Sequence, residues 1–228
     1  MQKITAISIA LNVVIIAGII AKKIYYSHKS SNKGEMSYAD SWNRGRTLVF
    51  EDLPSDTADI VFVGDSQTEK FPLNEMIRND HVKNRGIGFN TSAHILGRID
   101  NILLGQPHKL FLQMGINDFE NGISSDSLFK NYIAVIHRVR KLSPTTTLFI
   151  ESIFPLSHYT EQGRKWEDTV ERFNSRLKAL CRQEQVQFID IFTGLYKNNG
   201  IDTTLSWDGL HLNGDGYVIW AKKVEPYI

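Results

Sequence analysis

Short apolar runs rich in β-branched residues alternate with longer amphipathic stretches along most of the chain. This alternation is typical of βαβ units, in which helices connect the strands of a parallel sheet. Four of the five apolar runs are almost continuous, as expected for strands that are covered on both faces. The predicted strands are Asp59–Val63, Val82–Arg85, Lys109–Met114, Thr147–Ser152 and Val186–Phe192.

The stretches between these runs carry apolar residues at helical spacing. The clearest is Ser125–Leu142, which Ser143 and Pro144 bring to a stop. The other predicted helices are Thr91–Leu104, Lys165–Gln183 and Asn213–Lys223. The pattern therefore predicts an α/β fold, a three-layer α/β/α sandwich of the flavodoxin-like kind with a mainly five-stranded parallel sheet. A functional site in such a fold belongs at the carboxyl ends of the strands.

The amino-terminal segment has a different character, because Ile4–Ala21 is a run of 18 residues without a charge. As a helix it would extend about 27 Å, close to the thickness of a bilayer core. Lys3 precedes the run and Lys22 and Lys23 follow it, as in a membrane anchor. A cleaved signal peptide and a buried helix are the alternatives. The anchor is favoured, because the run exceeds the usual apolar core of a signal peptide.

This segment sets the expected domain organisation: an anchor or signal segment over 1–26, a tether and lead-in over 27–47, and a folded domain over 48–228. The expected location is the inner membrane of a bacterium, with the domain in the periplasm. The lysines that follow the run favour a cytoplasm-facing domain by the positive-inside rule, so that orientation stays open. A cleaved, secreted form is the third possibility.

Composition narrows the function classes. The 228 residues suffice for one well-buried core, and the net charge is +1. Residues 1–33 hold five lysines and no acid, which leaves 21 basic against 25 acidic side chains in the rest. Such a mildly acidic body repels phosphate backbones, so no nucleic-acid partner is expected. The single Cys181 and the lack of a phosphate-binding loop argue against a disulfide, a metal site and a nucleotide cofactor.

Three motifs follow predicted strands or lie near the carboxyl terminus. Ser66, in Gly-Asp-Ser, follows the first strand, and Asn117 follows the third. Asp208 and His211 lie three residues apart, so the carboxylate can orient the imidazole as a general base. Each motif alone is a common turn or helix cap. Together they supply a nucleophile, an amide donor and a base, which favours serine-dependent acyl transfer chemistry.

With these motifs, the sequence from about Leu48 to Ile228 resembles the SGNH hydrolase family, also called GDSL esterases. The resemblance implies Ser66 as nucleophile, His211 as base and Asp208 as its partner. It also implies the Asn117 amide and the backbone N–H of Ser66 as oxyanion donors. A further donor is expected in the block Asn84–Thr91, where the family typically shows a glycine before an aspartate. This chain has Phe89 at that position, and Gly88 is the alternative donor.

The resemblance implies a serine ester hydrolase that needs no cofactor and acts on short-chain esters, with acetyl esters as the expected case. It extends to members similar to platelet-activating-factor acetylhydrolases and carbohydrate acetylesterases. The expected partner is a small ester or an acylated glycan, with a carbohydrate or a lipid as the alcohol part. Alternatives are a membrane-tethered O-acetyltransferase and a non-catalytic glycan-binding module. His158, in the loop after the fourth strand, could line the substrate cleft. No oligomeric state is predicted.

Overall fold

The structure, a computed structural model, describes residues 37–157 and 161–228. The apolar run Ile4–Ala21 and the loop residue His158 lie outside the described residues. Within the described part, no helix is both long and apolar enough to cross a bilayer. The amino-terminal anchor therefore stays a prediction.

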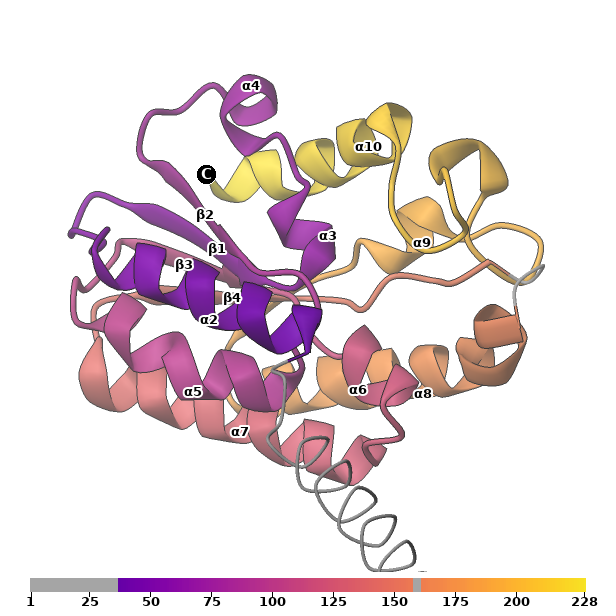
Figure 1. Ribbon diagram of the computed structural model, residues 1–228, viewed down its shortest axis with the longest axis horizontal. Coiled ribbons are helices and arrows are strands. Elements are labelled where there is room, and N and C mark those ends of the chain that lie inside the picture. The colour runs from indigo at the N-terminus through magenta and orange to yellow at the C-terminus, as the bar shows by residue number, and fades with distance from the viewer. Residues whose placement is uncertain (1–36, 158–160) are drawn as a thin grey trace, which may run out of the picture. The chain divides into compact units, whose positions relative to one another are not determined.

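A sheet of five parallel strands forms the centre of the compact unit Trp42–Ile228 (Figure 1). Its strand order is β2-β1-β3-β4-β5, so β1 pairs with both β2 and β3. The predicted α/β sandwich with five parallel strands is confirmed. Because the chain winds outward from β1 in both directions, the carboxyl ends of β1 and β3 form a topological switch point, where sites are usually built. The strands are β1 (Ile60–Gly64), β2 (Val82–Gly86), β3 (Lys109–Leu112), β4 (Thr147–Glu151) and β5 (Gln187–Ile189).

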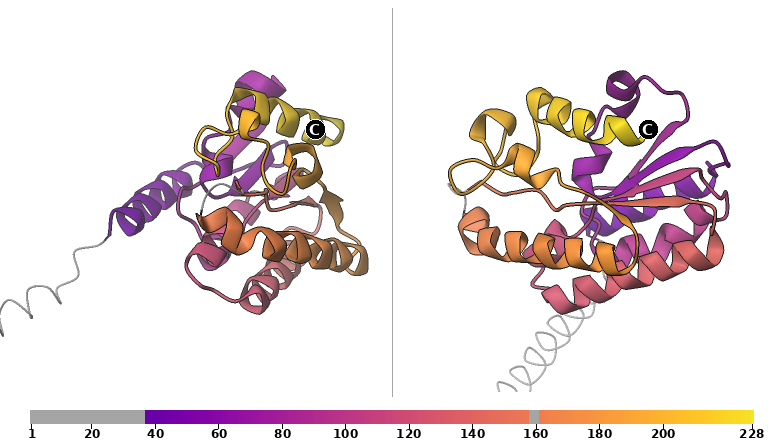
Figure 2. Two further views of the ribbon diagram at one scale, coloured as in Figure 1. Left: turned by 90° about the vertical axis from the view of Figure 1, so that its right-hand side faces the viewer. Right: turned by 180° about the vertical axis from the view of Figure 1, so that it is seen from behind.

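Helices cover both faces of the sheet (Figure 2). One face packs against α5 (Ser92–Leu103), α7 (Ser125–Leu142) and α8 (Glu161–Gln183), and the other packs against α4 (Leu73–Ile77) and α10 (Gly214–Val224). The remaining elements are short, apart from the first: α2 (Tyr38–Glu51), α3 (Ser66–Glu69), α6 (Ile116–Glu120), α9 (Phe192–Leu195) and the 3-10 turns Thr203–Leu205 and Glu225–Tyr227.

Successive side chains along each strand point to opposite faces of the sheet, so each strand contributes to two separate cores. On β1, Val61 and Val63 face α5, α7 and α8, whereas Phe62 faces α10. Phe62, Phe111 and Phe149 then stack across three neighbouring strands on that second face, with ring centroids 4.4 and 4.6 Å apart. These buried, stacked rings hold β1, β3 and β4 in register and fix where the strands end.

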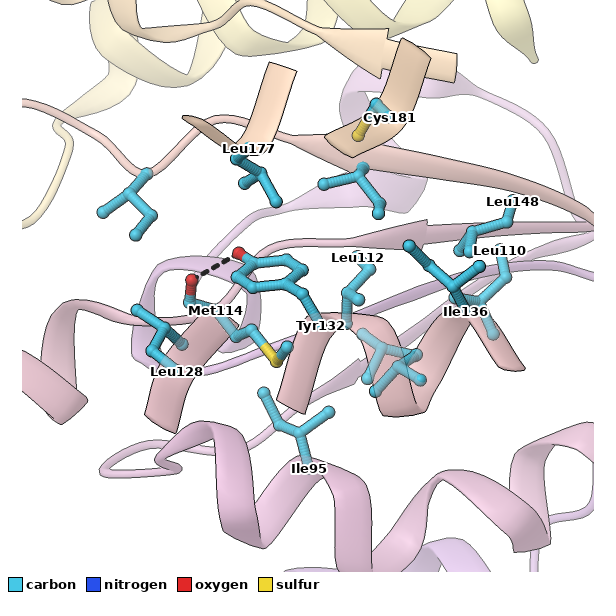
Figure 3. Packing of buried hydrophobic residues seen from close by; sticks show 14 of the residues in the cluster. Ile95, Leu110, Leu112, Met114, Leu128, Tyr132, Ile136, Leu148, Leu177 and Cys181 are labelled. Carbon is cyan, nitrogen blue, oxygen red and sulfur yellow. Dashed lines mark hydrogen bonds between the residues drawn. The ribbon is translucent and has the colours of Figure 1, made fainter. Parts of the chain in front are cut away.

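The first core also reaches the end of β3. The hydroxyl of Tyr132 on α7 donates a hydrogen bond to the carbonyl oxygen of Met114 at 2.6 Å, deep among aliphatic side chains (Figure 3). Met114 is followed by Gly115, whose φ of +129° suits glycine, and then by α6. Packing against α7 therefore determines where the chain leaves the strand and turns into the segment that carries Asn117.

Two of the differences from the predicted pattern concern β5 and the lead-in. The last strand stops at Ile189 rather than Phe192, because the hydroxyl oxygen of Ser152 accepts hydrogen bonds from the backbone N–H groups of Ile191 and Phe192 and turns the chain into α9. Helix α2 begins at Tyr38, inside the lead-in expected over 27–47, and the compact unit begins at Trp42. The division of the chain into anchor, tether and domain stays a prediction.

Candidate active site

Ser66 begins helix α3 directly after β1. The Asp65 carboxylate caps this helix by accepting a hydrogen bond from the Gln67 backbone N–H at 2.9 Å. The turn is so tight that a Cβ on Gly64 would lie 2.1 Å from Thr68 Oγ1 and 2.7 Å from the Gln113 carbonyl oxygen. Only glycine fits there. The Gly-Asp-Ser sequence thus places the serine at the carboxyl edge of the sheet, at the amino end of a short helix.

The structure brings Ser66, His211 and Asp208 into one hydrogen-bonded line. Ser66 Oγ lies 3.0 Å from His211 Nε2, although 145 positions separate the two residues in the chain. His211 Nδ1 lies 2.6 Å from Asp208 Oδ2. An ionised carboxylate can only accept, so Nδ1 carries the proton and the lone pair of Nε2 points at the serine hydroxyl. This is the arrangement that a general base needs to activate a serine.

Asp208 is held in its ionised form. Partial burial alone would raise its pKa, but hydrogen bonds from the His211 ring and from the backbone N–H groups of His211 and Leu210 outweigh burial and lower the pKa below its ordinary value. The carboxylate therefore stays charged at neutral pH. It can stabilise the positive charge that His211 acquires when it takes a proton.

The loop that carries His211 is attached to the residue after Ser66. Gln67 Nε2 donates to the Leu210 carbonyl oxygen at 2.6 Å, and the Tyr217 hydroxyl donates to the Gln67 carbonyl oxygen at 3.2 Å. Within the loop, Ser206 Oγ accepts from the Gly209 N–H and donates to the His211 carbonyl oxygen. These bonds position the imidazole against the serine from several directions.

Asn117 lies on α6, beyond the end of β3. Its side-chain nitrogen donates one hydrogen to the Asn90 carbonyl oxygen at 2.9 Å, and its second hydrogen can be donated to a bound group. The neighbouring Asp118 carboxylate accepts a hydrogen bond from the Ser92 backbone N–H at 2.8 Å, at the amino end of α5. Because the bond to the Asn90 carbonyl holds one hydrogen of the Asn117 amide, the other hydrogen is oriented in advance as a donor for an oxyanion.

The segment Asn84–Thr91 contains two candidate oxyanion donors, the backbone N–H groups of Gly88 and Phe89, and their environments differ. The backbone N–H of Gly88 donates to Glu69 Oε2 at 3.1 Å, so its one hydrogen is already used. Gly88 therefore contacts α3 through this group, which favours Phe89 over Gly88 as the donor, and the assignment of the donor stays a prediction. Phe89 has a φ of 63°, in the left-handed region that favours glycine, and its ring is 50% exposed. The backbone at this position thus has a conformation that glycine adopts more readily than phenylalanine.

Beneath the serine, two charged side chains are buried. Burial raises the pKa of Asp65 to about 7, and its Oδ2 has no hydrogen-bond partner among the described residues. The Arg98 guanidinium donates to Asn90 Oδ1 at 2.8 Å and to the Gly64 carbonyl oxygen at 3.0 Å, and burial lowers its pKa to about 9. Arg98 therefore links the end of β1 to the block that contains Phe89.

Residues 62–219 match the sequence model of the GDSL-like lipase/acylhydrolase family, which is more than half of the chain. The chain belongs to this family. It is therefore a hydrolase, and the resemblance noted from the sequence motifs is confirmed.

Similar proteins cover nearly the whole domain. Platelet-activating factor acetylhydrolase IB subunit alpha2 of Rattus norvegicus is 26% identical over 197 residues, 83% of this chain and 84% of the relative. A solved structure from Streptococcus pneumoniae, described as a platelet activating factor, has 25% identity and a TM-score of 0.75 over 82% of this chain and 92% of its own. An acetylxylan esterase from Geobacillus stearothermophilus, Axe2, shares the fold, with 15% identity and a TM-score of 0.59 over 74% and 93%.

Trp207 is a site residue that the motifs did not indicate. Its ring is 64% exposed and stacks on the His211 imidazole, with centroids 5.5 Å apart and planes 13° apart. Lys70 Nζ lies 5.5 Å from the centroid of the same indole ring. The signal available in the sequence was the position of an aromatic residue directly before Asp208, in a polar turn where nothing requires a large ring.

Metal ligands and the cysteine thiol are the other candidate reactive groups among the described residues. Within residues 37–157 and 161–228, no group of three or more His, Cys, Asp or Glu side chains is placed to hold a metal ion. Cys181 is buried in the first core, where burial raises the pKa of its thiol to about 12, so it does not form a thiolate nucleophile at neutral pH.

Proposed function

We propose that this hydrolase is a serine esterase that works through an acyl-enzyme. The observation that carries the proposal is the line Ser66 Oγ–His211 Nε2–Asp208, with distances of 3.0 and 2.6 Å. Ser66 Oγ forms a bond to the ester carbonyl carbon while its proton passes to His211 Nε2. The tetrahedral intermediate then expels the alcohol, which takes that proton. Water attacks the acylated serine by the same route and releases the carboxylic acid and free Ser66.

The oxyanion of each tetrahedral intermediate needs donors on the side away from His211. The second hydrogen of the Asn117 amide, the backbone N–H of Ser66 and the backbone N–H of Phe89 are the proposed set. Asn117 is favoured by its anchored amide. Phe89 is favoured over Gly88, because Glu69 already uses the Gly88 N–H. Donors fixed before the reaction begins stabilise the developing charge without a cost of reorganisation.

The proposed substrate is a short-chain ester, most simply an acetyl ester, on a glycan or another small alcohol. Two relatives support a short acyl group, since one is named an acetylhydrolase and one fold neighbour an acetylxylan esterase. The exposed rings of Trp207 and Phe89 support a flat, partly apolar alcohol such as a sugar ring. Transfer of the acyl group to a second alcohol instead of water is an outcome that the experiment distinguishes.

The test uses the full chain in mild detergent with 4-nitrophenyl acetate, butyrate and octanoate, and with acetylated xylan. We expect acetate release without an added acceptor, and kcat/KM that falls as the acyl chain lengthens. Ser66→Ala should lower kcat by several orders of magnitude and remove labelling by a fluorophosphonate, which mass spectrometry locates on Ser66. Wild-type turnover in Ser66→Ala would overturn the mechanism. Product formation only with an acceptor alcohol would assign the enzyme to acyl transfer.

The proposal places the enzyme at a bacterial inner membrane, anchored by residues 1–26, with the domain in the periplasm. It is supported by the chargeless run Ile4–Ala21, while Lys22 and Lys23 count against this orientation. The intact chain should stay with membranes through a high-salt wash, because apolar insertion is not screened by salt. Alkaline phosphatase fused after Ile228 should be active. An inactive fusion together with a fluorescent cytoplasmic reporter would place the domain on the other side.

A further inference from the structure

We propose that helix α2, which precedes the family match, positions the oxyanion donors, and that its Asn43 acts on Asn117 through Asn90. The inference rests on the proposed esterase function and deepens it. The family match begins at residue 62, so α2 lies before the matched region. It is also separate from the predicted anchor, which ends about residue 26.

Asn90 is the residue through which the contact is transmitted. It is 1% exposed, and each of its polar groups is engaged. Its backbone carbonyl oxygen accepts from Asn117 Nδ2, its Oδ1 accepts from Arg98 Nε, and its Nδ2 donates to Asn43 Oδ1 on α2. A displaced Asn90 would therefore displace the carbonyl that orients the Asn117 amide. Asn43 is the partner that holds Asn90 from outside the sheet.

Helix α2 also supports the residue before Phe89, through Glu69. Trp42 Nε1 donates to Glu69 Oε1 at 3.1 Å, and Arg46 Nε lies 3.7 Å from that oxygen. Glu69 Oε2 in turn accepts from the backbone N–H of Gly88. The residues before and after Phe89 are thus both fixed by side chains that α2 contacts. Phe89, the proposed backbone donor, lies between these two supports.

Such support has a physical reason. A non-glycine residue in the left-handed region has an energetic cost, and it persists only where its surroundings hold it. The segment of Gly88, Phe89 and Asn90 carries this cost at Phe89. If Asn43 were removed, the buried Asn90 amide would lose its partner and the segment would relax toward other conformations. The oxyanion donors would then be less well placed, while the substrate-binding surface and the Ser66–His211 pair would persist.

The test is a double-mutant cycle measured on the full chain with 4-nitrophenyl acetate. Asn43→Ala should lower kcat about tenfold at nearly unchanged KM in the wild-type background, and less than twofold when Asn117→Ala is already present, because coupled residues are non-additive. Asn43→Asp keeps an acceptor oxygen and should restore kcat to within about twofold. Arg44→Ala, on the exposed side of α2, is the matched control and should leave kcat unchanged.

The outcomes separate this inference from the proposed function. Equal fold-losses for Asn43→Ala in both backgrounds, or no loss in either, would overturn the positioning role. If Asn117→Ala itself leaves kcat unchanged, the oxyanion assignment fails first, and the inference falls with it. Should Asn43→Ala fail to fold, Trp42→Phe gives a second test, since Trp42 is 37% exposed and the change removes the indole N–H that binds Glu69. A lower kcat at constant KM supports the inference, and an unchanged kcat overturns it.

Discussion

The indole ring of Trp207 lies nearly parallel to the imidazole ring of His211, with ring centroids 5.5 Å apart. One face of the imidazole is therefore covered by an aromatic surface, while its two nitrogens point at Ser66 and Asp208. The electron-rich face of an indole attracts cations. The stack thus favours the positively charged ring that forms during catalysis and limits how far His211 can swing.

Trp207→Ala should lower kcat by about 2-fold to 30-fold, corresponding to about 0.5–2 kcal/mol of lost cation–π interaction. Trp207→Phe retains an aromatic face and should recover most of the loss. Steady-state kinetics with 4-nitrophenyl acetate measures both. Val218→Ala, another exposed apolar side chain, serves as the control and should behave as wild type. If Trp207→Ala keeps the wild-type kcat, the stack plays no part in the reaction.

Asn117→Ala should lower kcat by about 10²-fold to 10³-fold, or about 2.7–4 kcal/mol, with little change in KM, because the amide contacts charge that exists only in the transition state. Asn117→Asp is the matched variant, since it keeps the size of the side chain but cannot donate when ionised. It should lose at least as much. A raised KM at an unchanged kcat would make Asn117 a ground-state binding residue instead.

Phe89→Gly should leave kcat within about threefold of wild type, because the proposed donor is the backbone N–H and glycine has one too. The free energy of unfolding should stay within about 1 kcal/mol. Relief of about 1–2 kcal/mol of left-handed strain is offset by about 0.5–1 kcal/mol of backbone entropy. Phe89→Ala removes the ring and keeps the strain. A tenfold loss in both variants would show that the ring itself takes part in catalysis.

The carboxyl of Glu151 is buried against Trp220 Nε1, and burial raises its pKa to about 8. Between its ordinary value of 4.5 and this value the folded chain holds more protons than the unfolded chain, so the free energy of unfolding falls as the pH rises. The buried Asp65 contributes in the same direction up to a pH of about 7. High pH therefore destabilises the folded domain, whereas Asp208, whose pKa lies below its ordinary value, is already ionised and does not change.

Glu151→Gln should remove the larger part of this decline, because glutamine keeps an acceptor for Trp220 and does not ionise. Its stability advantage over wild type should grow from a pH of about 4.5 to about 8, with an upper limit of about 5 kcal/mol. Urea denaturation at several pH values measures it. A difference that does not change with pH would mean that Glu151 is charged in the folded state.

The pairing of Ser66 with His211 could be predicted because the rules that place each residue are local. Ser66 and Asn117 each follow a buried strand, and carboxyl ends of parallel strands share an edge. Asp208 and His211 are close in the chain, so their spacing alone indicated the pair. The strand that was predicted too long, ending at Phe192, shows the limit: a single hydroxyl, Ser152 Oγ, decides where β5 ends, and no pattern in β5 itself carries that information.

Helix α2 could not be predicted from periodicity. Of its 14 residues only Asn43 and Phe50 are buried, so no apolar stripe marks the helix, and Leu48 and Val49 are exposed. Its interaction with the rest of the domain depends on polar contacts to Glu69 and Asn90, which are distant in the chain. The hydrogen bond from the Gly88 N–H to Glu69 could not be predicted either, because it depends on how β2 lies beside α3.

The 145 positions between Ser66 and His211 have a consequence for biosynthesis. The sheet and the serine turn precede the His211 loop in the chain. The contacts between this loop and the serine turn come from late residues, since the Leu210 carbonyl accepts from Gln67 Nε2 and the Tyr217 hydroxyl donates to the Gln67 carbonyl. A nascent chain therefore has Ser66, the proposed nucleophile, in place long before it has His211, the proposed base. Under the proposed mechanism, the chain has no esterase activity until translation is nearly complete. A chain shortened by a stop codon after β5 would be inactive toward esters even if its sheet had formed.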